Sequence, residues 1–181
     1  MVFDRDGVVN RCPGPGAYVL SWEDFHFNPG IIEALRLCRQ RGYVTVLATS
    51  QQGVGKGLMS LQELDRIHQR MQQELQLQQA AFDSIKSCTC LQRDPTCRCR
   101  KPSPQMLHEA AAELGLDLAR SLLIGDAPRD IDMARQAGLS CCIRILGTKD
   151  EAEDPPAEHR LEGTAGLAML LEQLLAPLPT P

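Results

Sequence analysis

Short apolar runs alternate with longer amphipathic stretches along the chain. The apolar runs lie at residues 1–3, 43–48, 121–124 and 140–146, and a shorter strand-like segment lies at 84–87. Continuous apolar runs of this kind are typical of strands that are buried on both faces of a sheet. The pattern therefore predicts five strands in a covered sheet.

Between these runs, apolar residues recur at three- and four-residue spacing, which predicts amphipathic helices. The predicted helices cover residues 29–41, 60–79, 103–115, 129–137 and 164–175. We expect Asn28 and Pro29 to cap and open the first helix, and Ser60 to cap the second. His68 lies in the second helix, which has a glutamine-rich end, and we expect it on the solvated face.

The alternation of strands and helices predicts an α/β fold, a Rossmann-like three-layer sandwich around a mainly parallel sheet. The chain has 181 residues, so we expect one domain over residues 1–176 and a frayed tail at 177–181. Residues 148–158 are acidic and contain proline, which predicts a loop. Ligands of such folds bind at the carboxyl ends of the strands.

The composition indicates a small-molecule partner. A net charge of -4 and an aromatic content of 4% argue against a nucleic-acid groove built from basic and stacking residues. No apolar stretch approaches the roughly 18 residues needed to span a bilayer, and the charged start is unlike a signal peptide. We therefore expect a cytoplasmic monomer with neither a membrane nor a nucleic-acid partner.

Two carboxylates follow the first apolar run, in Asp4-Arg5-Asp6-Gly7. Calcium-binding loops also begin with Asp-x-Asp, but here glycine is the fourth residue rather than the sixth, and Pro15 replaces the glutamate at the twelfth position. A solvated acidic turn remains the alternative. Against that alternative, Thr49 and Asp126 also follow predicted strands, so these side chains are expected to converge on one crevice.

These carboxylates have the chemistry that hydrolysis of a phosphate monoester requires. Asp4 can attack phosphorus, while Asp6 can protonate the leaving alcohol and then activate water. Mg²⁺ prefers oxygen ligands, so we expect Asp4, the Asp6 backbone carbonyl and Asp126 to contribute to its coordination.

Polar and basic residues elsewhere can bind the phosphate itself. Thr49 and Ser50 can donate hydroxyl and backbone hydrogen bonds at a strand end. Lys101 can neutralise the phosphoryl charge, and the forked guanidinium of Arg100 suits a second anionic group. The sequence therefore contains every group that the reaction needs.

Four segments resemble, in order, the motifs of the haloacid dehalogenase superfamily of phosphatases. They are Asp4-Arg5-Asp6-Gly7, Ala48-Thr49-Ser50-Gln51, Arg100-Lys101-Pro102, and Gly125-Asp126 with Asp130. The chain looks most similar to the heptose 1,7-bisphosphate 7-phosphatase branch, with histidinol-phosphate phosphatase as the nearest alternative. The markers of this branch are Asp-Arg-Asp-Gly-x-x-Asn at 4–10, the stretch at 53–57, and the run Cys97-Arg98-Cys99-Arg100-Lys101-Pro102.

The resemblance extends to about residue 175 and implies a fold without a large cap domain. It also implies Mg²⁺-dependent removal of the 7-phosphate from D-glycero-D-manno-heptose 1,7-bisphosphate through an aspartyl-phosphate. The implied catalytic residues are Asp4, Asp6, Thr49 and Lys101; the implied substrate-binding residues are Ser50, Gln51, Gln52 and Arg100; the implied Mg²⁺ ligands are Asp4, Asp6 and Asp126.

Four of the eight cysteines, Cys88, Cys90, Cys97 and Cys99, lie in one loop at 88–99. In extended chain the two thiols of a Cys-x-Cys pair point the same way, so two pairs can hold one structural Zn²⁺. Two disulfides are the alternative, which a cytoplasmic location disfavours. Zinc would order the chain that leads into Arg100-Lys101.

The chain departs from the branch pattern in three places. Ser50 replaces an asparagine, Ala127 replaces a lysine, and only three residues precede Asp4. We therefore expect altered affinity or substrate choice and a weakened central strand. A polynucleotide 3'-phosphatase and a non-catalytic sugar-phosphate binder are the alternatives from other functional classes.

Overall fold

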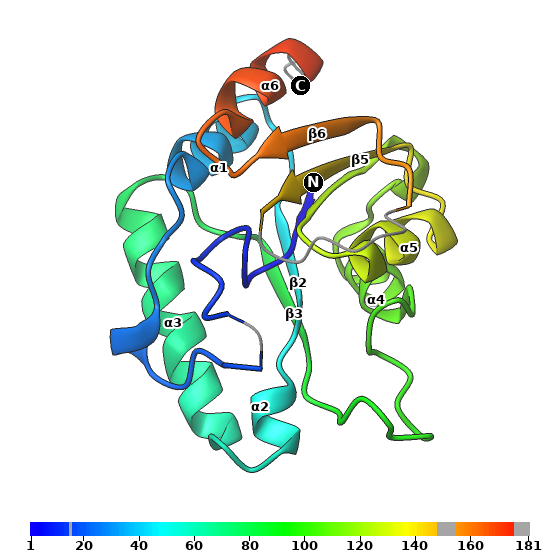
Figure 1. Ribbon diagram of the computed structural model, residues 1–181. Coiled ribbons are helices and arrows are strands. Elements are labelled where there is room, and N and C mark those ends of the chain that lie inside the picture. The colour runs from blue at the N-terminus through cyan, green and yellow to red at the C-terminus, as the bar shows by residue number, and fades with distance from the viewer. Residues whose placement is uncertain (15, 148–154, 176–181) are drawn as a thin grey trace.

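A parallel sheet of six strands forms the centre of the computed structural model, which describes residues 1–14, 16–147 and 155–175 (Figure 1). The strands lie in the order β3-β2-β1-β4-β5-β6, and every neighbouring pair is parallel. Their bounds are β1 Val2–Phe3, β2 Val46–Ser50, β3 Ser84–Cys88, β4 Leu122–Gly125, β5 Cys141–Leu146 and β6 His159–Glu162. This sheet confirms the predicted fold class.

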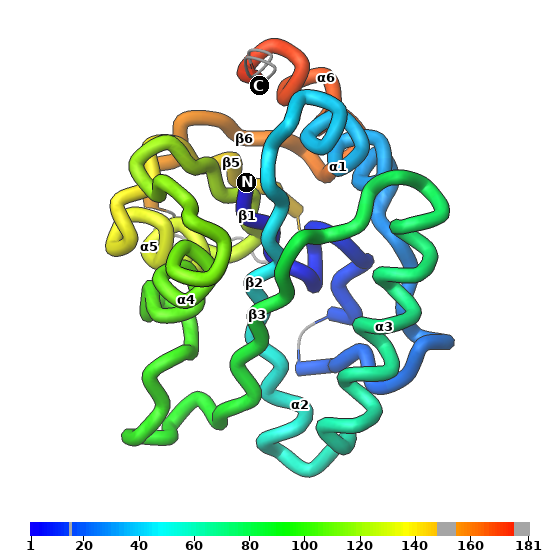
Figure 2. The backbone as a smooth tube through the Cα atoms, turned by 180° about the vertical axis from the view of Figure 1, so that it is seen from behind, coloured from blue at the N-terminus to red at the C-terminus, as the bar shows by residue number. Residues whose placement is uncertain are grey.

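Helices cover both faces of the sheet, so the molecule has three layers (Figures 1 and 2). One face carries α1, α3 and α6, while α4 and α5 cover the other. Their bounds are α1 Ile31–Gln40, α3 Leu61–Leu77, α4 Gln105–Leu114, α5 Pro128–Gln136 and α6 Leu167–Leu174. Three short elements complete the described chain, namely η1 Trp22–Asp24, α2 Gln52–Gly55 and η2 Leu118–Arg120.

The apolar runs are continuous because successive strand residues enter two different cores. Phe3 and Leu47 pack in the core under α1, α3 and α6. Val2, Val46 and Ala48 point the other way, into the core under α4 and α5. Alternate residues of a strand face opposite sides, so a sheet covered on both sides needs apolar residues at every position.

The central strand β1 has only two residues, but each is paired on both sides. Val2 lies opposite Val46 and Leu123, and Phe3 lies opposite the next residue of each neighbour. The Asp4 backbone N–H continues this pairing by donating to the Ile124 carbonyl at 3.0 Å. Asp4 therefore begins its loop from a fixed position between β2 and β4.

The predicted start of the first helix is wrong. The N-cap of α1 is Gly30, with a φ of 78°, and not Asn28. An added Cβ at Gly30 would lie 2.8 Å from the Thr164 carbonyl, so glycine permits this close turn. The Asn28 amide instead donates to the carbonyls of Val8 and Asn10, both at 3.0 Å, and so braces the loop after Asp4.

Other elements also differ from the prediction. β2 begins at Val46 rather than residue 43, because the backbone N–H groups before it form hydrogen bonds outside the sheet. The Tyr43 N–H donates to the Cys38 carbonyl, and the Thr45 N–H donates to the Asp83 carboxylate. β6 was not predicted, and neither was α2. Most of the predicted loop at 148–158 and all of the predicted tail at 177–181 lie outside the described residues.

Candidate active site

Four buried polar side chains from separate segments meet at the carboxyl edge of the sheet. Asp4 follows β1, Thr49 lies near the end of β2, and Asp126 follows β4. Lys101 joins them from the chain that follows the cysteine loop, and all four are less than 9% exposed. The predicted convergence is confirmed, and a solvated acidic turn does not fit this burial.

Lys101 lies between two carboxylates. Its Nζ is 2.7 Å from Asp4 Oδ1 and 2.7 Å from Asp130 Oδ1. Burial alone would lower the pKa of Lys101, but the charges and hydrogen bonds of Asp130 and Asp4 outweigh burial and raise it. The site therefore holds a permanent cation directly beside the carboxylate of Asp4.

Three buried carboxylates form a group that suits a hard metal ion. One oxygen from each of Asp4, Asp126 and Asp130 lies within 4.8 Å of the others. Carboxylate oxygens are the donors that Mg²⁺ prefers. An added Cβ at Gly7 would lie 1.8 Å from Asp126 Oδ2, so a glycine, here with a φ of 105°, is needed for the first loop to approach this group.

Asp130 is the member of this group to which the sequence assigned no metal-binding role. It lies in the first turn of α5, where its Oδ2 accepts the Ala127 backbone N–H at 3.0 Å. An added Cβ at Gly125 would lie 2.4 Å from Asp130 Cβ, so this segment also depends on glycine. Two signals pointed to it, namely its place in the fourth motif and its position three residues into a helix that begins with proline.

The Asp6 carboxylate is held away from the metal-binding group by donors of its own. Arg5 Nη2 lies 3.0 Å from its Oδ1, the Asn10 amide donates to Oδ1 at 3.0 Å, and the Gln51 amide donates to Oδ2 at 2.9 Å. Burial alone would raise the pKa of Asp6, but the Arg5 guanidinium and these hydrogen bonds lower it. The carboxylate is still 23% exposed, so it remains in contact with solvent.

His68 is the residue whose predicted environment is wrong. The ring is 7% exposed, and its Nε2 lies 3.2 Å from Arg5 Nη1. Burial first, and then the charge of Arg5, lower the pKa of His68 to about 3. The site thus has a chain of contacts, His68 to Arg5 to Asp6, that sequence reasoning missed.

The predicted substrate-binding residues of the second motif have different environments. The Gln51 amide is buried and also donates to Thr49 Oγ1 at 2.8 Å, so it links Thr49 to Asp6. Ser50 Oγ is buried and has no hydrogen-bond partner in the described part of the chain. Gln52 begins α2 and accepts a hydrogen bond from the Tyr18 hydroxyl at 3.4 Å.

The four clustered cysteines converge as predicted. Their sulfurs lie within 4.8 Å of one another, with pairs at 3.6, 3.8 and 3.9 Å, and none of the eight cysteines forms a disulfide. Four sulfurs at tetrahedral Zn–S distances would be about 3.8 Å apart. The cluster therefore fits a Zn²⁺ ion rather than two disulfides.

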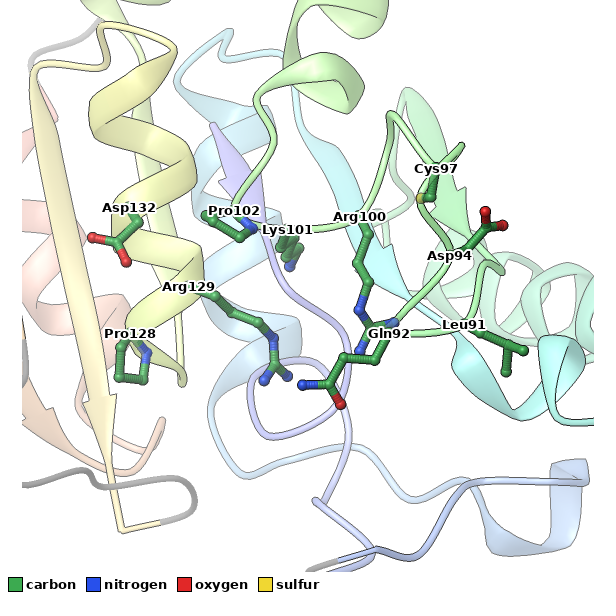
Figure 3. Close-up of a pocket in the computed structure, with 10 residues that line it drawn as sticks. All are labelled: Leu91, Gln92, Asp94, Cys97, Arg100, Lys101, Pro102, Pro128, Arg129 and Asp132. Carbon is green, nitrogen blue, oxygen red and sulfur yellow. The ribbon is translucent and has the colours of Figure 1, made fainter.

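The cysteine loop leads directly into the wall of a cavity. Arg100 Nη1 donates to the Cys90 carbonyl at 3.3 Å, and Arg100 and Lys101 both line a cavity of about 550 Å³ (Figure 3). Pro128 and Arg129, from the first turn of α5, line the opposite side. This volume is in the range of small-molecule sites.

Comparisons with known proteins agree with this geometry. A family model described as HAD-hydrolase-like matches residues 98–163. The D-glycero-beta-D-manno-heptose-1,7-bisphosphate 7-phosphatase of Bordetella bronchiseptica is 34% identical over 178 residues, which are 97% of this chain and 97% of that protein. The chain belongs to the heptose bisphosphate phosphatase family of the haloacid dehalogenase superfamily.

Further members of this family show how widely the likeness extends. The crystal structure of D,D-heptose 1,7-bisphosphate phosphatase from B. bronchiseptica, complexed with magnesium and phosphate, matches with a TM-score of 0.85 at 32% identity, over 96% of this chain and 98% of that one. A Campylobacter jejuni relative, named for the alpha anomer of the substrate, is 33% identical over 153 residues, which are 84% of this chain and 86% of that protein. The family thus includes enzymes named for both anomers.

Membership in the haloacid dehalogenase superfamily confirms the predicted phosphatase class and the use of Mg²⁺. Two of the three departures from the family pattern are substitutions, and each puts buried atoms at its position. Ala127 is fully buried at the start of α5, and Ser50 presents the unpartnered hydroxyl described above.

Within the described residues, no helix is both long and apolar enough to cross a membrane.

Proposed function

We propose that the protein removes the 7-phosphate of D-glycero-D-manno-heptose 1,7-bisphosphate by Mg²⁺-dependent hydrolysis. The observation that carries the proposal is the contact of Lys101 Nζ with Asp4 Oδ1 at 2.7 Å, beside the carboxylates of Asp126 and Asp130. This arrangement supports the proposal, because a cation and carboxylates that could hold a metal ion lie beside the carboxylate that we propose as the nucleophile. The names of the relatives support the choice of substrate.

In the proposed mechanism, Asp4 acts as the nucleophile. An Asp4 carboxylate oxygen bonds to phosphorus as the bond from phosphorus to the sugar oxygen breaks, and the sugar oxygen takes a proton from Asp6. Water then attacks the aspartyl-phosphate, gives a proton to Asp6, and releases inorganic phosphate and free Asp4. Bound Mg²⁺ would supply further positive charge to the phosphoryl oxygens, held by Asp4, Asp126 and the Asp6 carbonyl, with Asp130 beside them.

The environment of Asp6 suits both halves of this cycle. The Arg5 guanidinium and the hydrogen bonds of Gln51 and Asn10 lower the pKa of Asp6, which favours the ionised form that takes a proton from water. A bound phosphate brings negative charge next to this carboxylate and raises its pKa, which favours the protonated form that the first step needs. Thr49 and Lys101 would hold the phosphoryl oxygens, since both are buried beside Asp4.

Substrate binding and the state of the protein complete the proposal. Ser50, Gln51, Gln52 and Arg100 would contact the substrate, and zinc would fix the loop at 88–99 that precedes Arg100. We also propose one domain over residues 1–176 that acts in the cytoplasm as a monomer, without nucleic acid. The net charge of -4 and the absence of disulfides among the eight cysteines support this view.

The test is the substitution Asp4→Asn, with the exposed Asp65→Asn on α3 as the matched control. Asp4→Asn removes the nucleophile with little change in shape, so Mg²⁺-dependent phosphate release from the bisphosphate is expected to disappear. Zinc content and the circular dichroism spectrum are expected to stay unchanged. The Asp65→Asn variant is expected to retain wild-type activity, because Asp65 is exposed and belongs neither to the carboxylate group nor to the lining of the cavity.

Wild type is assayed in parallel on both anomers of the bisphosphate, on histidinol phosphate and on a 3'-phosphorylated oligonucleotide. A higher kcat/KM on histidinol phosphate or release of phosphate from the oligonucleotide would overturn the proposed substrate. Inertness of wild type on a broad panel of phosphate esters, with intact binding of sugar phosphates, would instead establish a non-catalytic binder.

A further inference from the structure

The cavity beside the nucleophile receives two guanidinium groups from opposite walls. Arg100 comes from the chain after the cysteine loop, and Arg129 comes from the first turn of α5. Figure 3 shows both side chains directed into the same space, with the Gln92 amide between them. Lys101 lines the same cavity but is already bound to Asp4 and Asp130.

The helix geometry explains the direction of Arg129. Pro128 is the first residue of α5, so Arg129 lies in the first turn, at the end of the helix that faces the carboxyl edge of the sheet. Side chains of an α-helix lean toward its N-terminus. Arg129 therefore extends beyond the helix end, over the site, rather than along the helix surface.

Neither guanidinium is neutralised by a carboxylate in the described part of the chain. Two acidic residues line the same cavity, but Figure 3 shows the carboxylates of Asp132 and Asp94 turned away from the two arginines. Asp94 Oδ1 instead accepts the Thr96 N–H at 2.9 Å and its hydroxyl at 2.7 Å. Asp132 is one turn from Arg129, close enough in sequence to pair, yet it forms no described ion pair with it.

Arg129 also carries a donor without an acceptor. Its Nε is buried and has no hydrogen-bond partner among the described residues. A buried N–H without an acceptor is costly, and two guanidiniums beside one cavity repel each other. An anion bound between them would satisfy the donor and neutralise the repulsion at once, and a phosphate matches the forked geometry of both groups.

We propose that Arg129 is a specificity-determining residue that, together with Arg100, binds the second phosphate of a bisphosphorylated sugar. Lys101 and Asp4 engage the phosphate that is hydrolysed, while Arg100 and Arg129 hold the phosphate that stays on the product. The inference rests on the proposed function, because it assigns the two phosphates of the same substrate to two parts of the cavity. It gives the first turn of α5 a role in choosing bisphosphates over monophosphates.

The test compares Arg129→Gln with wild type on D-glycero-D-manno-heptose 1,7-bisphosphate and on the 7-phosphate, which lacks the second phosphate. Loss of a charge-assisted contact is expected to lower kcat/KM on the bisphosphate by about 10- to 100-fold, mainly through KM. On the 7-phosphate the change in kcat/KM is expected to stay within about threefold, because this substrate has no second phosphate for Arg129 to bind. Arg129→Lys, which keeps the charge but not the fork, is expected to fall between wild type and Arg129→Gln.

Arg120→Gln is the matched control, because Arg120 is an exposed arginine in η2 whose loss changes the net charge equally. It is expected to leave kcat/KM on both substrates unchanged, and neither variant is expected to lower the melting temperature. An equal loss on the bisphosphate and the 7-phosphate, or no loss on either, would overturn the role of Arg129 alone. A wild-type enzyme without preference for the bisphosphate would overturn both this inference and the proposed substrate, whatever Arg129→Gln does.

Discussion

At the scale of single residues, Arg5 contacts two side chains, and its charge favours an ionised Asp6 and a neutral His68. Its fully buried guanidinium lies 3.0 Å from Asp6 Oδ1 and 3.2 Å from His68 Nε2. A guanidinium has only donors, so the ring nitrogen facing it must be an acceptor, which requires neutral His68. His68 therefore helps to hold the residue that positions Asp6.

The first prediction concerns the pH dependence of stability through His68. The pKa of His68 falls from 6.5 to about 3 on folding, so between these values the unfolded chain binds more protons than the folded one. This residue therefore makes the free energy of unfolding decrease as the pH falls through that window, by at most about 1.4 kcal/mol per pH unit. His68→Gln, a neutral acceptor, is expected to give a shallower slope in urea unfolding between pH 4.5 and 7.

The control is His108→Gln, because His108 is exposed on α4 and is hydrated in both states. That variant is expected to follow the wild-type slope. Parallel curves for wild type and His68→Gln would contradict the buried neutral ring.

Part of the reason for the burial of His68 can be read from the sequence. It lies four residues after Leu64 and three before Met71, which both belong to the buried face of α3. A histidine on an apolar stripe is buried unless something prevents it, and Arg5 supplies the partner that makes burial possible. That partner comes from 63 residues away, which no local pattern contains.

At the scale of elements, the cysteine loop contacts both α2 and the side chain of Arg100. An added Cβ at Gly55, the last residue of α2, would lie 2.4 Å from the Thr89 carbonyl. The loop backbone also receives the Arg100 side chain at the Cys90 carbonyl. The loop thus contacts α2, which follows the second motif, while it carries the third motif at its end.

The second prediction is that zinc maintains this arrangement. Cys99→Ser removes one of the four thiolates, so bound zinc is expected to be lost and trypsin is expected to cut the loop at Arg93 or Arg98. Because Lys101 follows this loop, kcat/KM is expected to fall by about 100-fold. Metal analysis and limited proteolysis on one sample measure both effects.

Cys12→Ser serves as the control, because Cys12 lies outside the cluster and is a free thiol. It is expected to keep its zinc and its resistance to trypsin. Zinc-free Cys99→Ser with an uncut loop and full activity would show that the metal does not order this segment.

Elements with strong local signals were predictable, and those defined by their neighbours were not. The Ser60 cap of α3 was predicted and is present, with its hydroxyl accepting the Glu63 N–H at 3.0 Å. By contrast, β6 has a mostly exposed or half-buried sequence, and pairing with β5 alone makes it a strand. The cap at Gly30 likewise depends on contact with Thr164, which is distant in sequence.

At the scale of the whole molecule, both cores and both halves of the sheet meet at β1. Phe3 is fully buried, lies between β2 and β4, and packs edge-on against Phe82 with ring centroids 5.8 Å apart. The side chain therefore contributes to the core under α1 and α3 and to the placement of the adjacent Asp4. β1 therefore both positions Asp4 and contributes to the stability of the whole fold.

The third prediction is that Phe3→Ala destabilises the protein by about 3 to 5 kcal/mol, because it leaves a cavity that the packed surroundings cannot close. Urea unfolding measures the change. Leu77→Ala, at a side chain that is 79% exposed at the end of α3, is expected to change the free energy of unfolding by about 0.5 kcal/mol or less. A change of similar size in both variants would contradict the central position assigned to Phe3.

The shortness of β1 has a consequence for how the protein acquires activity. Asp4 has almost no strand of its own, so it is placed by β2 on one side and β4 on the other, and Lys101 reaches it across 97 positions of sequence. Such long-range pairings form late in folding, because the entropy of closing large loops must be lost first. During refolding, helical structure can therefore return before Asp4 and Lys101 are in contact. Catalytic activity is then recovered only when folding is complete.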